Sequence, residues 1–119
     1  MPYVGGTDVD REKTWKWTDG TKMTYKRWRK DEPNNLNGRE HCLIVGIGDV
    51  GANWLDVTCT GKRNFVCKMT YYHGNTYFIA TEKKNFDHAE RHCVSMKGHL
   101  TSIHSKAEND FLVAELNKR

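Results

Sequence analysis

The chain has 119 residues with a formal net charge of +4, and 37% of its residues are hydrophobic, which suffices for one domain with a single core. The mild charge and the lack of a recognisable module argue against nucleic-acid binding. No stretch approaches the roughly 20 apolar residues of a membrane helix, so membrane insertion is not expected.

The first part of the chain, residues 3–68, has the pattern of short strands separated by long loops. Trp15-Lys16-Trp17 alternates apolar and polar residues, and the turn signal Asp19-Gly20 follows it. Further strands are predicted at CLIVG (42–46), NFVCK (64–68) and, after the polar stretch YYHGN, YFIA (77–80).

A helix is predicted where the hydrophobic period changes. Phe86, Ala89, Cys93 and Met96 recur at helical spacing, and Gly98 is a plausible stop.

A second helix is predicted to begin after Ser105. Ser105 and Glu108 form a capping box, in which each side chain can accept from the other residue's backbone N–H group. The expected buried stripe comprises Ala107, Phe111, Leu112 and Leu116. Strands first and helices last predict an α+β domain.

The literal glycine motif Gly46-Ile47-Gly48-Asp49-Val50-Gly51 follows a predicted strand. A dinucleotide site also needs a helix beginning there, because the phosphate binds the helix amides. The residues that follow, ANWLDVTC, instead have a strand pattern. We therefore expect a glycine-rich loop and no nucleotide cofactor.

A basic stretch, KMTYKRWRK at 22–30, carries the densest positive charge of the chain. A solvated basic face is the simplest interpretation, and attraction to anionic glycans is the alternative.

The four cysteines are Cys42, Cys59, Cys67 and Cys93. No CxxC pair occurs, so a structural zinc site is not expected. An even number in a small domain suggests two disulfides and a secreted or extracellular protein, with three pairings open. The six histidines show no ligand spacing, and we assign them no metal role.

The polar segment KDEPNNLNGREHC at 30–42 contains Glu32, Asn34 and Glu40, and Asp56 follows the next predicted strand. Carboxylate and amide oxygens suit calcium, which takes six to eight oxygen ligands. The spacing is not that of an EF-hand, and a solvated acidic loop is the alternative. Pro33 stiffens the segment, and a cis Glu32–Pro33 bond would be compatible with a tight turn.

Several motifs together resemble those of the C-type lectin domain family over essentially the whole chain. They are YVGG at 3–6 for the family's WIGL, TWKWTDG at 14–20, the EPN tripeptide at 32–34, EHC at 40–42 for its E-x-C, WLD at 54–56 for its WND, and the closing NFVCK. The resemblance implies an α+β domain with two helices, short antiparallel sheets and a long loop region. It also implies the disulfides Cys42–Cys59 and Cys67–Cys93.

The two parts of the chain stand in exchanged order relative to that family. Residues 1–70 resemble its C-terminal part, and residues 71–119 resemble its N-terminal part. The chain therefore looks like a circular permutant, in which the family's first and last strands pair and a direct turn joins them. The alternative is the tail of one domain joined to the head of the next in a tandem array, which would need partner chains to complete its core.

The resemblance implies calcium bound by Glu32, Asn34, Glu40 and Asp56, with sugar hydroxyls sharing the same side chains. The EPN order implies mannose-type glycans. Leu55 departs from the family pattern, because it replaces an asparagine that would supply both an oxygen and a hydrogen bond. Calcium binding and sugar binding should both be weakened.

A second calcium site of the family is matched only in part. Asp8 and Glu12 fit its pattern, but Asn35 and His41 stand where acids are usual. We expect this site to be weak at most.

The sequence thus favours a calcium-dependent carbohydrate-binding domain. The alternative is a lectin-like domain that binds a protein receptor or another non-sugar ligand without calcium, for which Leu55 is the best argument. No set of nucleophile, base and acid is apparent, so an enzyme is not expected.

Overall fold

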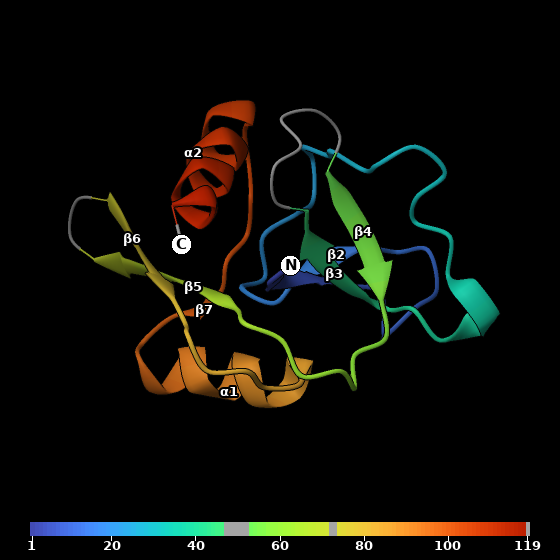
Figure 1. Cartoon of the computed structure of the whole chain (residues 1–119), viewed down its shortest axis with the longest axis horizontal. Coiled ribbons are helices and arrows are strands. Elements are labelled where there is room, and N and C mark those ends of the chain that lie inside the picture. The colour runs from blue at the N-terminus through green and yellow to red at the C-terminus, as the bar shows by residue number, and fades with distance from the viewer. Residues whose placement is uncertain (47–52, 72–73, 119) are drawn as a thin grey trace.

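The computed structural model describes residues 1–46, 53–71 and 74–118 (Figure 1). The elements, in chain order, are β1 (Tyr3–Thr7), β2 (Lys16–Trp17), the 3-10 helix η1 (Leu36–Gly38), β3 (Cys42–Val45), β4 (Trp54–Val57), β5 (Val66–Tyr71), β6 (Gly74–Ile79), α1 (Phe86–Ser95), β7 (His99–Leu100) and α2 (Lys106–Asn117). The predicted α+β class is confirmed. Apart from Gly46, the predicted glycine-rich loop at 46–51 lies outside the described residues.

The strands form two antiparallel sheets, in the orders β2-β1-β3-β4 and β6-β5-β7. All four residues of β3 are buried, as its continuous apolar run predicts. In Figure 1 the three-stranded sheet lies between α1 and α2, and the loop that carries η1 lies on the opposite side of the molecule from these helices.

Strand β5 connects two core clusters because its side chains alternate between its faces. Cys67 and Met69 belong to a cluster with Phe86 and Ala89 of α1. Val66 belongs to the other cluster, together with the buried residues of α2. Both clusters also contain residues of β1 and β3, so each draws on both halves of the chain.

The hairpin of β5 and β6 is longer than the sequence predicts. The pairing runs from Val66 opposite Ile79 to Tyr71 opposite Gly74, so it includes most of the stretch expected to be a polar break. The faces of β6 are largely exposed and therefore carry little apolar alternation. This strand is defined by its main-chain hydrogen bonds to β5, which the hydrophobic pattern of the sequence does not reveal.

Helix α1 agrees with its prediction, except for the role of Gly98. The helix begins after Asn85, whose side chain accepts from the His88 N–H group. The left-handed residue after the helix is Lys97 (φ 69°). Gly98 is instead required by close approach, because a Cβ there would lie 2.4 Å from the Lys68 carbonyl oxygen.

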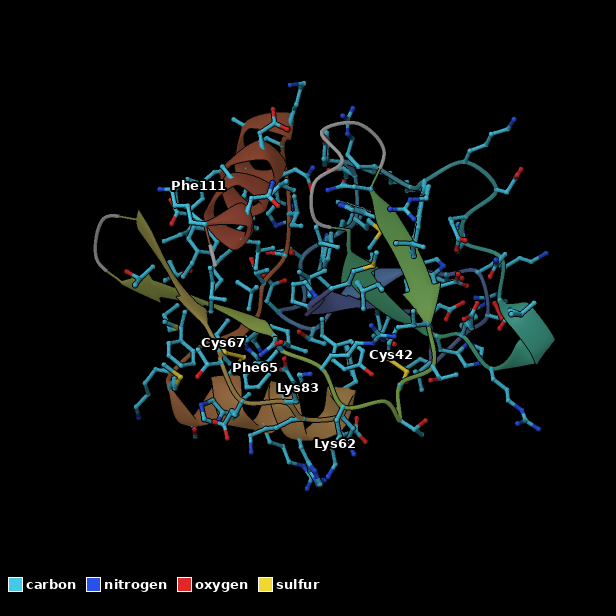
Figure 2. All side chains as sticks on the ribbon, viewed as in Figure 1. Cys42, Lys62, Phe65, Cys67, Lys83 and Phe111 are labelled. Carbon is cyan, nitrogen blue, oxygen red and sulfur yellow. A yellow bond between two sulfur atoms is a disulfide. The ribbon has the colours of Figure 1, made fainter. Side chains whose placement is uncertain are left out.

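Helix α2 begins as predicted but buries a different face. Its buried residues are Asn109, Leu112, Val113 and Leu116, while Ala107 is exposed and Phe111 is 47% exposed. Figure 2 shows Phe111 on the outer side of the helix. Leu112 and Leu116 are buried as predicted, but Ala107 and Phe111 are not, because the helix turns Asn109 and Val113 toward the core in their place.

The amide of Asn109 is satisfied inside the protein. It accepts from Trp54 Nε1 at 2.9 Å and donates to Asn53 Oδ1 at 3.2 Å. A buried amide with both partners is tolerated in a core.

The capping box at the start of α2 forms in part. Ser105 Oγ accepts from the Glu108 N–H group, but Glu108 Oε1 accepts from His104 N and not from Ser105 N.

Both disulfides have the pairing that the family resemblance implies, Cys42–Cys59 and Cys67–Cys93. Figure 2 shows Cys67 close to α1 and Cys42 near the end of β4. None of the helices among the described residues is long and apolar enough to cross a membrane.

Candidate metal and ligand site

The polar loop before β3 is fastened to β4 by a single carboxylate. Asp56, which is 3% exposed, accepts from the backbone N–H groups of Asn34 at 3.0 Å and Asn35 at 2.6 Å. The Glu32–Pro33 peptide bond is cis, as considered from the sequence, and Asn35 has a left-handed backbone with φ 45°. These contacts bring Asp56 to the EPN tripeptide across 22 residues of chain.

Glu32 lies against Asp56. Its Oε1 accepts weakly from the Asp56 N–H group at 3.5 Å, and its Oε2 accepts from Asn34 Nδ2 at 3.2 Å. Burial and the neighbouring Asp56 carboxyl, with a smaller contribution from Glu40, raise the pKa of Glu32 to about 7. The Asp56 and Glu40 carboxyls add negative charge beside Glu32, an environment that favours a bound cation.

Glu40 joins the group through the backbone of Leu36. The Leu36 N–H group donates to both Glu40 Oε1 at 3.1 Å and Asn34 Oδ1 at 3.2 Å, so these two oxygens lie close together. The loop therefore gathers all four residues that the sequence singled out.

Their acids do not form the tightest cluster, however. Within the described ranges, the group of three or more His, Cys, Asp and Glu ligand atoms that all lie within 4.8 Å of one another consists of Asp8, Glu12 and His41. Glu32, Glu40 and Asp56 are more widely spaced than that.

Leu55 faces the protein interior. It is half-buried, pairs with Ile44 in the β3–β4 ladder and packs against the cluster that contains Tyr3 and Cys42. It offers no oxygen to the loop.

The second cluster centres on His41, whose Nδ1 lies 3.0 Å from Asp8 Oδ1 and 3.8 Å from Glu12 Oε1. Burial alone would lower the pKa of His41, but the hydrogen bond and charge of Asp8 raise it. Asp8 and Glu12 were expected from the sequence, whereas the histidines were assigned no metal role. The signal that could have found His41 was its position in the family pattern, where an acid is usual.

One cavity of about 440 Å³ connects the two clusters. Its lining includes Asp8 and Glu12 from one cluster and Asn34 and Asp56 from the other. A second cavity, of about 340 Å³, lies away from both clusters and is lined by residues near the two chain ends, including Pro2 and Leu116.

Comparison with known proteins agrees with this architecture. The family model for the lectin C-type domain matches residues 1–69 and 82–119. The chain belongs to the C-type lectin domain family.

Similar members of the C-type lectin family include ladderlectin of Oncorhynchus mykiss, 40% identical over 49% of this chain and 30% of its own length. The galactose-specific lectin nattectin of Thalassophryne nattereri is 38% identical over 55% of this chain and 40% of its own length. The C-type mannose receptor 2 of Mus musculus is 25% identical over 98% of this chain, which is 9% of the receptor. The chain thus spans less than half the length of each of these relatives.

Proposed function

We propose that this domain binds carbohydrate through a calcium ion held by Glu32, Asn34, Glu40 and Asp56. The observation that carries the proposal is the contact of Asp56 with the backbone of the EPN loop, which places a distant carboxylate beside Glu32. All of the donor atoms are carboxylate or amide oxygens, the ligands that calcium prefers.

The residues of this loop would hold both ion and sugar. A bound calcium ion supplies coordination positions for sugar hydroxyls. Glu32 and Glu40 can accept hydrogen bonds from those hydroxyls, and the Asn34 amide can donate one. Each of these side chains has more than one lone pair or N–H group, so one residue can serve both partners.

A preference for mannose-type glycans is proposed from the EPN order of residues 32–34. The names of the relatives point to different sugars, since nattectin is described as galactose-specific and another relative as a mannose receptor. Leu55 supplies no fifth side-chain ligand, so we propose a weak site. Strong retention on glycan surfaces would then require several copies.

A calcium-independent domain that binds a protein is the second candidate. Leu55 favours this candidate because it supplies no side-chain ligand. Asp56 favours it because each of its two carboxylate oxygens already accepts a hydrogen bond from a backbone N–H group. For either candidate, we propose an extracellular location, because both disulfides would persist in an oxidising compartment.

Calorimetric titration with calcium, followed by retention on mannose resin with calcium and with EDTA, tests the proposal. The chain should bind calcium, and EDTA should release it from the resin. Glu32→Gln should weaken both calcium binding and retention on the resin. The control Glu115→Gln on α2 should change neither of these. Glycan retention that survives EDTA, or an absence of calcium binding, would reject calcium-dependent recognition and favour the second candidate.

A further inference from the structure

The cluster of Asp8, Glu12 and His41 fits calcium poorly, although the family resemblance places a calcium site there. We propose that these three side chains instead form a site for Zn²⁺ with one open coordination position. This site does not depend on the calcium site of the EPN loop.

The spacing of the donor atoms suits a small tetrahedral ion. Zinc bonds to imidazole nitrogen and carboxylate oxygen are about 2.0–2.2 Å long, so neighbouring ligand atoms stand about 3.4 Å apart. His41 Nδ1 is 3.0 Å from Asp8 Oδ1 and 3.8 Å from Glu12 Oε1, which brackets that separation. Small shifts of exposed Glu12 would complete the geometry.

The orientation of the His41 ring also favours a metal ion at Nδ1. Its Nε2 lies 3.2 Å from the carbonyl oxygen of Gly38, and only an N–H group can bond to that acceptor. In the neutral ring, Nδ1 then bears a lone pair that faces two carboxylates. Such an arrangement needs a proton or a metal ion between the groups. Metal-bound histidines characteristically donate their other ring N–H to a carbonyl or carboxylate in this way.

Both carboxylates accept a hydrogen bond from the backbone of Lys13 through the oxygen that is not offered to His41. The Lys13 N–H group donates to Asp8 Oδ2 at 2.9 Å and to Glu12 Oε2 at 3.1 Å. Asp8 Oδ1 is thereby left facing His41 Nδ1 at 3.0 Å, while Glu12 Oε1 lies 3.8 Å from that nitrogen and also accepts from Asn35 Nδ2. Asp8 is only 1% exposed, so its carboxylate is fixed within the fold before any ion binds.

The chemistry of the donors decides between the two ions. Calcium takes six to eight oxygen ligands, and an imidazole nitrogen is not among its usual partners. Imidazole with carboxylates is a common ligand set for zinc, which leaves a fourth position open when the protein supplies three. The replacement of acids by Asn35 and His41 thus changes which metal the site prefers.

Metal-free protein without an affinity tag is titrated with ZnCl₂ by calorimetry and with CoCl₂ by visible spectroscopy. One zinc ion should bind, and cobalt should show the d–d bands of tetrahedral coordination. Zinc at a hundredfold excess over its Kd should raise Tm by roughly 10 °C.

The matched variant is His41→Asp, which restores the family's acid. It should weaken zinc binding by more than about a hundredfold, because loss of a ligand exceeds the 10–100-fold effect of losing a ligand's supporting partner. It should also add one calcium ion to the stoichiometry. Glu12→Gln, which removes a different ligand, decides the matter if the aspartate variant does not fold.

Two controls separate this site from other possibilities. His88→Ala, an exposed histidine of α1, should leave zinc affinity unchanged. Glu32→Gln should weaken calcium binding and retain zinc, so failure of the calcium proposal would not affect this test. Zinc affinity that survives both His41→Asp and Glu12→Gln would overturn the inference.

Discussion

Lys68 Nζ lies 2.7 Å from Glu108 Oε2, so a buried ion pair joins β5 to α2 across the two halves of the chain. The side chains are 8% and 13% exposed. Lys68 also donates to Ser102 Oγ, and the Tyr77 hydroxyl donates to Glu108 Oε2. Burial alone would raise the pKa of Glu108, but the bonds from Lys68 and Tyr77 lower it.

Replacing Lys68 with methionine should therefore be strongly destabilising. The substitution leaves the Glu108 carboxylate buried without its cation, which typically costs about 3–5 kcal/mol. Urea denaturation of the variant measures the loss. The control is Lys106→Met, which removes an exposed pair with Asp110 and should cost no more than about 0.5 kcal/mol. Equal losses in the two variants would contradict the special role of the buried pair.

The pKa of Glu32 predicts how stability depends on pH when calcium is absent. It is raised from an ordinary value of 4.5 to about 7, so between these values the folded protein retains a proton that the unfolded chain has lost. The free energy of unfolding in EDTA should therefore fall as the pH rises from 5 to 7.5.

Glu32→Gln should reduce this slope, and denaturation curves over a pH series measure it. Part of the slope should remain, because the raised pKa of His41 acts in the same direction. Glu82→Gln, an exposed acid distant from the loop, should keep the full slope. An unchanged slope in the Glu32 variant would mean that its carboxyl does not titrate near neutral pH.

The Cys67–Cys93 disulfide allows a test of the exchanged order of the halves. It closes a segment with a sequence separation of 26, whereas in the family's order the same bridge would span the remaining 93 of the 119 residues. By the chain-entropy model its removal should cost about 3 kcal/mol here and about 1 kcal/mol more after the halves are returned to the family's order. Equal losses in the two proteins would show that strain or residual structure outweighs chain entropy.

We infer that the chain is a circular permutant that folds as a monomer. The β5–β6 hairpin closes the sheet within one chain, and residues near both ends line one cavity. Matches to ladderlectin and nattectin cover only about half of the chain, which supports an exchanged order, because a collinear alignment follows one half at a time. The mannose receptor match covers 98% of the chain, which supports the tandem alternative.

Light scattering after size-exclusion chromatography separates these interpretations. The permutant should have the mass of one 13.8 kDa chain at all concentrations. A fragment of a tandem array should form a swapped dimer or a polymer, because each chain would then complete its neighbour's core.

The sequence predicts the parts of this fold in which apolar side chains determine the structure. Phe86, Ala89 and Cys93 identify α1 because each packs into the core. The buried face of α2 is predicted only in part, because the burial of Asn109 depends on a hydrogen bond with Trp54, which is 55 residues away in the chain. The full length of strand β6 is not predicted, because backbone pairing with β5, and not hydrophobic alternation, defines the strand.

The candidate site divides in the same way. Glu32, Asn34 and Glu40 lie within one short motif and are visible in the sequence. Asp56 required the family resemblance, because local spacing does not reveal which distant acid reaches the loop. His41 was given no metal role, although the family pattern places it where an acid is usual, because its contact with Asp8, 33 residues earlier, is not visible in the local sequence.

The hairpin of β5 and β6 is the single covalent main-chain link between the two halves, and both cores are built from both halves. A protease that nicks the chain between Tyr71 and Gly74 would consequently produce two peptides still fastened by Cys67–Cys93. Reduction would then free them, and neither piece alone would possess a complete interior. The protein is thus suited to complementation assays, in which recovery of the native fold reports that the two separate peptides have associated.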